Sequence, residues 1–180
     1  MTPMTIRRAS PADAAVLAPF AARCFEQAFG AQNDPEDLAA HLAKSFGVAQ
    51  QTQELQHPDY VTLLALTAGD EPAGYAQLRR QPAPPCVTAA RPAELRRFYV
   101  DGRWHGSGVA GQLMQATLAA AHQTLGAASL WLSVWTENPR AVAFYARHGF
   151  AIAGSADFWV GSDRQSDHIM VRSALVPLTA

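Results

Sequence analysis

The stretch that decides the fold is "RFYVDGRWHGSGVAGQLMQATLAAA", Arg97 to Ala121. It begins as the end of a strand and finishes as a helix with apolar residues at helical spacing. Between the two lies the hexapeptide "GSGVAG", Gly106 to Gly111, which matches the pattern G-x-G-x-x-G. Backbone amides at a helix N-terminus attract anions, and glycines leave room for a phosphate to approach. The loop therefore predicts a pyrophosphate site, with a turn that merely packs the helix as the alternative.

Several details indicate which pyrophosphate ligand the loop would take. A P-loop requires Lys and Ser or Thr after its last glycine, whereas Gln112 and Leu113 stand here. A Rossmann turn puts its first glycine at the strand end, whereas residues 101–105 intervene here. Glu137 could be the ribose-binding acid of a dinucleotide site, but it lies further on than the usual ~20 residues. ATP in the P-loop mode is disfavoured, and NAD stays only as an alternative.

The rest of the chain predicts a mixed sheet. Turn signals and hydrophobic periodicity predict strands at 4–10, 60–67, 74–80, 94–100, 129–135, 150–156 and 168–174. They predict four helices: one that begins at Ser10, one over 33–47, one that follows the glycine loop and ends at Leu125, and one from Asn138 to Gly149. The order β, two helices, a β meander, then βαβαββ predicts an α/β fold with a mixed sheet, in a single domain over residues 1–180.

Composition excludes several classes of protein. The chain has 180 residues, 49% of them hydrophobic, and a net charge of -1, so it has no basic field for nucleic acid or anionic membranes. It shows no signal-peptide pattern and no apolar run long enough to cross a bilayer, which predicts a cytoplasmic protein. Cys24 and Cys86 are far apart, and no pair of histidines has metal-ligand spacing, so no metal is predicted.

At this point the sequence resembles the GNAT superfamily of acetyl-CoA-dependent N-acetyltransferases. "RWHGSG", Arg103 to Gly108, fits that family's [Q/R]-x-x-G-x-[G/A] signature, and "ENPRAVAFYARHGF", Glu137 to Phe150, resembles its Asn-x-x-Ala-x-x-Phe-Tyr-x-x-x-Gly-Phe helix. The flanks "DPEDLAAHLAKSF" and "FWVGSDRQSDHIM" look like PaiA-type acetyltransferases, a bacterial branch associated with polyamines. The resemblance implies the GNAT-type fold, a splayed central sheet flanked by helices.

The resemblance also implies acetyl-CoA as the co-substrate. The amides of the glycine loop would hold the pyrophosphate, and the pantetheine arm would lie between the strands at 94–100 and 129–135, much as a peptide adds to a sheet edge. The implied contact residues are Phe98, Tyr99, Val100, Arg103, His105, Gly106, Ser107, Gly108, Val109, Ala110, Gly111 and Asn138.

Two residues are the candidate catalytic groups. Glu94 stands where some members carry a basic glutamate, and the acceptor amine must lose a proton before it attacks. Asp101 and Glu137 are backup carboxylates, and a water chain is the alternative base. Tyr145 matches the family tyrosine that donates a proton to the leaving thiolate. The structural alternatives are a charge that caps the strand at Glu94 and a buried, hydrogen-bonded tyrosine at Tyr145.

The expected acceptor is a primary amine of a small molecule, with polyamines such as spermidine or spermine among the candidates. Amino sugars, aminoglycosides and peptide amines are the alternatives, and a non-catalytic acyl-CoA sensor is the alternative of another class. Acidic residues near the first helices could meet a cationic amine or simply favour helix starts: Glu26, Asp34, Glu36 and Asp37. Asp163, Asp167 and His168 are expected in a loop that shapes the acceptor pocket or keeps a turn soluble. The sequence does not decide whether the protein forms a homodimer.

Overall fold

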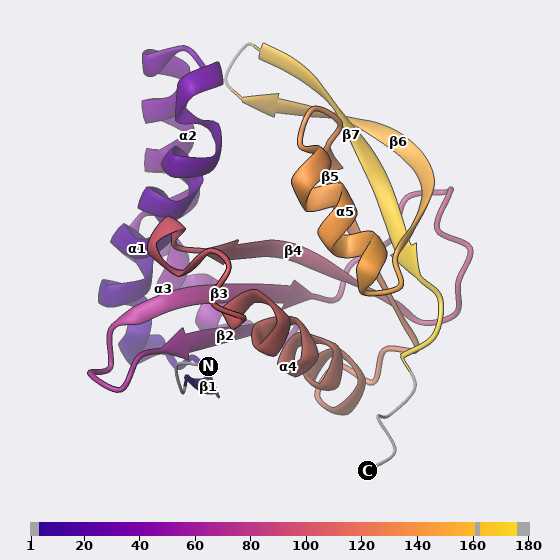
Figure 1. Ribbon diagram of the computed structural model, residues 1–180, viewed down its shortest axis with the longest axis horizontal. Coiled ribbons are helices and arrows are strands. Elements are labelled where there is room, and N and C mark those ends of the chain that lie inside the picture. Colours follow the sequence, from indigo (N-terminus) through magenta and orange to yellow (C-terminus); the bar gives the residue numbers. More distant parts are fainter. Residues whose placement is uncertain (1–3, 161–162, 176–180) are drawn as a thin grey trace.

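The computed structural model describes residues 4–160 and 163–175, which form a seven-stranded sheet in the order β1-β2-β3-β4-β5-β7-β6 (Figure 1). The strands are β1 (Thr5–Arg8), β2 (Tyr60–Leu66), β3 (Pro72–Arg79), β4 (Pro92–Val100), β5 (Ser129–Trp135), β6 (Ala151–Val160) and β7 (Asp163–Arg172). Five α-helices accompany them in these residues: α1 (Ala14–Phe29), α2 (Pro35–Phe46), α3 (Val48–Gln56), α4 (Val109–Gln123) and α5 (Pro139–Arg147). Short 3-10 turns lie at η1 (Pro11–Asp13), η2 (Gly30–Gln32) and η3 (Gly102–Trp104). The predicted mixed α/β sheet is confirmed.

Helices cover both faces of the sheet (Figure 1). On one face, α1 and α2 pack apolar side chains such as Phe20 and Phe25 against Leu64 and Tyr75 of the sheet. On the other face, α4 packs Leu113 and its neighbours against the opposite side chains of the same strands, and α5 contributes to that core. Strand residues alternate between the faces, so one strand serves both cores.

The structure adds a helix that the sequence analysis did not predict. Helix α3 occupies Val48–Gln56, directly after α2, and its fully buried residues are Gln51 and Glu54. A helix whose buried face is polar has no apolar period, so the pattern of hydrophobic residues misses it.

The last hairpin is longer than predicted. Strands β6 and β7 pair from Ala151 with Val171 to Val160 with Asp163, so Asp167 and His168 lie within β7 and not in a loop. The prediction of a loop there was wrong. The outer half of the hairpin carries exposed side chains such as Asp157, which hide the apolar alternation of a half-buried strand.

The sheet opens between its two central strands. Strands β4 and β5 are parallel, and they pair only from Pro92 with Ser129 to Glu94 with Trp131. Beyond that point β5, β7 and β6 turn away from the first four strands (Figure 1). All other neighbouring strands pair antiparallel. The carboxyl ends of β4 and β5 are therefore free of each other.

Candidate active site

A cleft of about 1080 Å³ occupies the opening between β4 and β5. Residues 94–100 of β4 line one wall, and Ser133, Val134 and Trp135 of β5 line the other. Helices α1, α2, α4 and α5 supply the remaining sides. The cleft thus passes through the sheet and joins its two helical faces.

The glycine loop closes one end of this cleft. Gly106 and Gly108 have φ of +80° and +90°, a left-handed backbone that glycine adopts without steric cost. Gly108 is the N-cap of α4, whose first amides have no partner within the helix. His105, Gly106, Gly108 and Ala110 line the cleft. The loop therefore presents free amides and a positive helix end to it.

The other predicted contact residues near this loop do not all line the cleft, because some are engaged elsewhere in the fold. Ser107 Oγ donates to the Trp104 carbonyl at 2.6 Å, Val109 is buried in the core, and Gly111 lies in the first turn of α4. Arg103 is paired with the buried Asp101 at 3.1 Å. Hydrogen bonds from Arg103 lower the pKa of Asp101 to about 2, which fits an ion pair better than the backup base that the sequence suggested.

Helix α5 brings Asn138 and Tyr145 to the cleft from the face that carries α4. Asn138 caps the helix, with Oδ1 accepting from the Ala141 amide at 3.1 Å. The Tyr145 ring packs edge-on against Phe98, Phe144 and Phe150. Burial raises the pKa of Tyr145, and the nearby Tyr99 adds to the rise, so the phenol keeps its proton at neutral pH.

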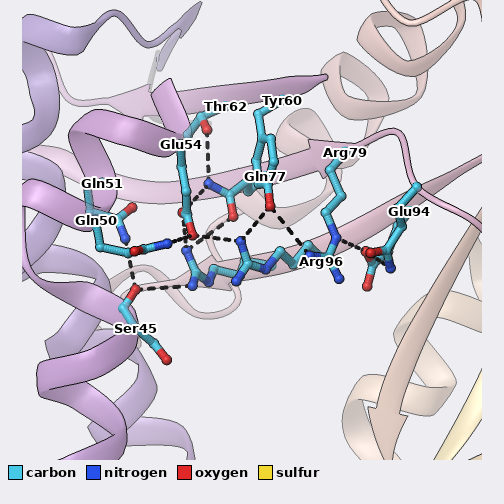
Figure 2. Close-up of polar contacts among 12 residues, drawn as sticks. Ser45, Gln50, Gln51, Glu54, Tyr60, Thr62, Gln77, Arg79, Glu94 and Arg96 are labelled. Carbon is cyan, nitrogen blue, oxygen red and sulfur yellow. Dashed lines mark hydrogen bonds and ion pairs between the residues drawn. The ribbon is translucent and has the colours of Figure 1, made fainter. Parts of the chain in front are cut away.

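Glu94 lies where the two central strands begin to separate. It is buried, and its Oε2 accepts hydrogen bonds from Arg79 Nε and, at 2.7 Å, from Gln81 Nε2. Figure 2 shows Arg79 reaching Glu94 from the neighbouring strand β3. Both contacts occupy the same carboxylate oxygen, Oε2. Glu137, the other backup carboxylate, is exposed in the turn before α5.

A buried charged network supports the β4 wall. Glu54 of α3 accepts from Arg96 and Arg97 at 2.7 Å each, and from Gln77 at 2.9 Å. Figure 2 shows these side chains converging on Glu54, with Tyr60 linking Arg96 to Arg79. Arg96 and Arg97 both line the cleft, so the network fixes two of its side chains. No sequence motif signals it, because its partners come from four separate elements, α3, β2, β3 and β4.

Aromatic side chains and a buried thiol line the aromatic end of the cleft, which is the side that α1 covers. Phe25 and Phe29 of α1 contact Tyr99 and Trp135 of the central strands, with ring centroids 6.5 Å and 6.3 Å apart. Cys24 lies among them, and burial with the Asp101 charge raises its pKa to about 12. Its thiol therefore stays protonated and is a poor nucleophile.

The acidic residues near the first helices stand apart from the cleft. Asp34 caps α2, since its side chain accepts from the amides of Glu36 and Asp37. Glu26 and Glu36 are exposed, and neither belongs to the cleft lining formed by the described residues. In the same residues, no cluster of three or more His, Cys, Asp or Glu side chains could hold a metal ion. No described helix is long and apolar enough to span a membrane.

The comparison with family models agrees with this geometry: the model of the acetyltransferase (GNAT) family matches residues 21–150. The chain belongs to the GNAT acetyltransferase family. The match covers most of the cleft, from α1 through the glycine loop and α5. This confirms the family that the residues around Gly106 and Tyr145 resemble.

Relatives and solved structures support the same assignment. An uncharacterized N-acetyltransferase of Mycobacterium tuberculosis is 36% identical over 160 residues, which cover 89% of this chain and 97% of that protein. The spermine/spermidine N(1)-acetyltransferase of Bacillus subtilis is 30% identical over 64 residues, covering 36% of this chain and 42% of that protein. The PaiA N-acetyltransferase of Thermoplasma acidophilum, solved with coenzyme A, has a TM-score of 0.75 at 19% identity, covering 95% and 99% of the two chains. The splayed sheet flanked by helices is thus the GNAT fold.

Acetyl-CoA fits the cleft of this GNAT enzyme. The separated edge of β4 leaves backbone groups open to an extended arm, and the α4 N-terminus offers amides for a pyrophosphate. Phe98, Tyr99 and Val100 line the cleft beside that edge.

Proposed function

We propose that this GNAT N-acetyltransferase transfers an acetyl group from acetyl-CoA to a primary amine of a small molecule, with polyamines as the leading candidates. The observation that carries the proposal is the opening between β4 and β5, whose lining includes both the glycine loop and the aromatic end. An extended acyl-CoA suits the part of the cleft beside the glycine loop, and a small amine suits the aromatic end.

When bound, acetyl-CoA would supply the acetyl group as a thioester. The amides of the α4 N-terminus would hold its pyrophosphate, and Asn138 and the β4 backbone would orient its arm. An amide of β4 would donate to the thioester oxygen and stabilise the negative charge that develops there. Tyr145 would give a proton to the departing sulfur.

The base needs a carboxylate that can receive a proton from the amine. The sequence suggested Glu94 for this step, and in the structure its Oε2 is occupied by hydrogen bonds from Arg79 and Gln81. Direct transfer without a covalent acyl-enzyme is consistent with the protonated thiol of Cys24, the cysteine that lines the cleft.

The polyamine candidate depends on similarity and on the aromatic end of the cleft. The similarity to the spermine/spermidine N(1)-acetyltransferase of Bacillus subtilis covers only 64 residues, so it supports the acceptor class weakly. The aromatic rings of α1 and the central strands attract cations, as a protonated amine is. Amino sugars, aminoglycosides and peptide amines are the competing acceptors.

A thiol-release assay with acetyl-CoA tests the proposal. We expect release on addition of spermidine or another small primary amine from a panel of polyamines, amino sugars, aminoglycosides and peptides. Binding of acetyl-CoA without release across the panel would instead favour an acyl-CoA sensor. In a parallel thermal-unfolding measurement acetyl-CoA should raise Tm and NADH should not, because only a ligand of the native state stabilises it.

A further inference from the structure

Strand β7 places one carboxylate at the aromatic end of the cleft. Asp167 pairs in register with Trp135 of β5, and residues opposite each other in an antiparallel pair point to the same face. Trp135 contacts Phe29 of α1, so Asp167 faces the side of the sheet that α1 covers. Tyr145 approaches from the other face with α5, and both residues line the same cleft. A substrate lying through the opening would meet both.

The Asp167 carboxylate has an unfilled hydrogen-bonding position. The side chain is only 5% exposed, and its Oδ2 accepts from Ser133 Oγ of β5 at 2.6 Å. Its Oδ1 is buried and accepts no hydrogen bond from the described residues. A buried carboxylate oxygen without a donor is costly, and a donor entering from the cleft would relieve that cost.

The groups around Asp167 favour a cationic ligand. Among the described residues, His168 on its own strand is the charged group that acts on Asp167, and Asp167 in turn acts on Tyr99 of β4. Burial raises the pKa of Asp167, while the Ser133 hydrogen bond and the charge of His168 oppose the rise. Burial also raises the pKa of Tyr99, and the Asp167 charge adds to that rise, so the tyrosine is a neutral aromatic wall. A carboxylate beside aromatic faces is a suitable receptor for an ammonium group.

We propose that Asp167 binds the ammonium group of the acceptor and takes its proton, with Ser133 as its positioning residue. This inference rests on the proposed acetyl transfer to an amine. It differs from the sequence hypothesis, which assigned the base to Glu94 and placed Asp167 in a loop.

The chemistry balances with the residues named. The R-NH3+ group gives one proton to Asp167 and becomes R-NH2. The amine nitrogen forms a C–N bond to the acetyl carbon, the C–S bond breaks, and the sulfur takes the Tyr145 proton. Tyr145 regains a proton from the acetylated nitrogen. Asp167 releases its proton to water as the products leave, so each turnover yields one acetamide, one thiol and one proton.

The two carboxylates among the described residues that line the cleft differ in their partners. Glu94 Oε2 is occupied by hydrogen bonds from the cationic Arg79 and from Gln81. Asp167 receives one from a neutral hydroxyl and is otherwise buried. Asp167 has both an oxygen without a donor among the described residues and a pKa raised by burial, and these suit it to take a proton from an amine.

The test compares Asp167→Asn with wild type, with spermidine and n-butylamine as the probes. At neutral pH we expect kcat/KM for the amine to fall by about 100-fold or more, with the Kd of acetyl-CoA unchanged. Wild-type kcat/KM should fall as pH drops through the raised pKa of Asp167, and this acid limb should disappear in the variant. Asp157→Asn is the matched control, because Asp157 is an exposed carboxylate on the neighbouring strand β6 and should leave both readouts unchanged.

A second variant probes the positioning role. Ser133→Ala removes the hydrogen bond that stabilises ionised Asp167, so the acid limb should move to higher pH while the enzyme remains active. If the acid limb of the kcat/KM profile lies at the same pH in Ser133→Ala as in wild type, the positioning role of Ser133 is overturned.

Calorimetric binding of the same amines to the coenzyme A-bound protein gives a readout that needs no turnover. We expect Asp167→Asn to weaken it by about 10-fold or more, the worth of one charge-assisted contact. Equal rates and equal amine affinities in Asp167→Asn and wild type would overturn the inference, as would an acid limb lost in Glu94→Gln but kept in Asp167→Asn. Absence of thiol release by wild-type enzyme would instead overturn the proposed function. In that case the amine affinities of wild type and Asp167→Asn would still test whether Asp167 binds the ammonium group.

Discussion

At the scale of single residues, the chemistry depends on protonation states that burial sets. Tyr145 and Asp167 both have raised pKa values because both are removed from water, and the rise favours the neutral form of each. A neutral phenol is ready to donate a proton, and a more basic carboxylate is ready to accept one. The roles proposed for the two groups are thus complementary, on opposite faces of the opening.

Tyr145→Phe tests the acid. We expect kcat to fall by about 10-fold or more, because the leaving sulfur loses its proton donor, while the Kd of acetyl-CoA stays nearly unchanged. Steady-state thiol release and calorimetric binding measure the two quantities. The matched control is Tyr75→Phe, since the Tyr75 hydroxyl is fully buried, unpartnered among the described residues and outside the cleft lining. A Tyr145→Phe enzyme with the wild-type rate would remove this residue from the mechanism.

At the scale of elements, the site depends on what each element leaves unpaired. Strand β4 stops pairing with β5 after Glu94, and helix α4 begins with amides that no earlier turn satisfies. In the proposed function, the same two features that cost backbone hydrogen bonds within the fold would provide the surface for the pantetheine arm and the pyrophosphate.

Gly106→Ala tests the loop, with Gly126→Ala as its control. Both glycines have positive φ, +80° and +64°, and a Cβ at either position would meet no atom within 4 Å. Each substitution should therefore cost a similar ~1 kcal/mol of stability. Only Gly106 lines the cleft, so only Gly106→Ala should weaken acetyl-CoA binding in calorimetry. Equal affinities in the two variants would mean that the loop does not contact the coenzyme.

At the scale of the whole molecule, buried charge joins the helical face to the sheet. Glu54 of α3 ties Gln77 of β3 and both arginines of β4, so the wall of the cleft is anchored to the fold behind it. Burial alone would raise the pKa of Glu54, but the charge of Arg97 and the hydrogen bonds from Gln50 and Gln77 outweigh it and lower the pKa. The network therefore favours an ionised Glu54.

Glu54→Gln should lower the free energy of unfolding by about 3 kcal/mol, because Arg97 is left buried without its counter-charge. Urea unfolding measures this loss, and Asp59→Asn is the control, since the pair of Asp59 with Arg80 is exposed and should contribute less than about 1 kcal/mol.

The lowered pKa of Glu54 also fixes the direction in which stability changes with pH. The stabilisation by Glu54 is present above the ordinary glutamate pKa and is lost as pH falls through the lower folded value, so acid should destabilise wild type more than Glu54→Gln. Equal acid sensitivity would show that Glu54 gains nothing from its partners.

The site was predictable in part because some of its chemistry lies in contiguous residues. The glycine loop, its strand and its helix are adjacent in sequence, and the motif around Asn138 and Tyr145 is equally local. Asp167 could not be assigned in the same way, since its role depends on Ser133, a residue 34 positions away that only strand pairing brings beside it. Helix α3 was missed because its buried residues are polar.

The sequence by itself determined the order of strands and helices apart from α3, the glycine loop and the family, since periodicity, glycine positions and capping residues are local properties of the chain. Only the tertiary structure decided that β4 and β5 separate after Glu94, that Arg79 pairs with Glu94, and that Asp167 faces the cleft. The physical reason is that burial, register and charge pairing are set by residues distant in sequence, and these set which carboxylate can take a proton.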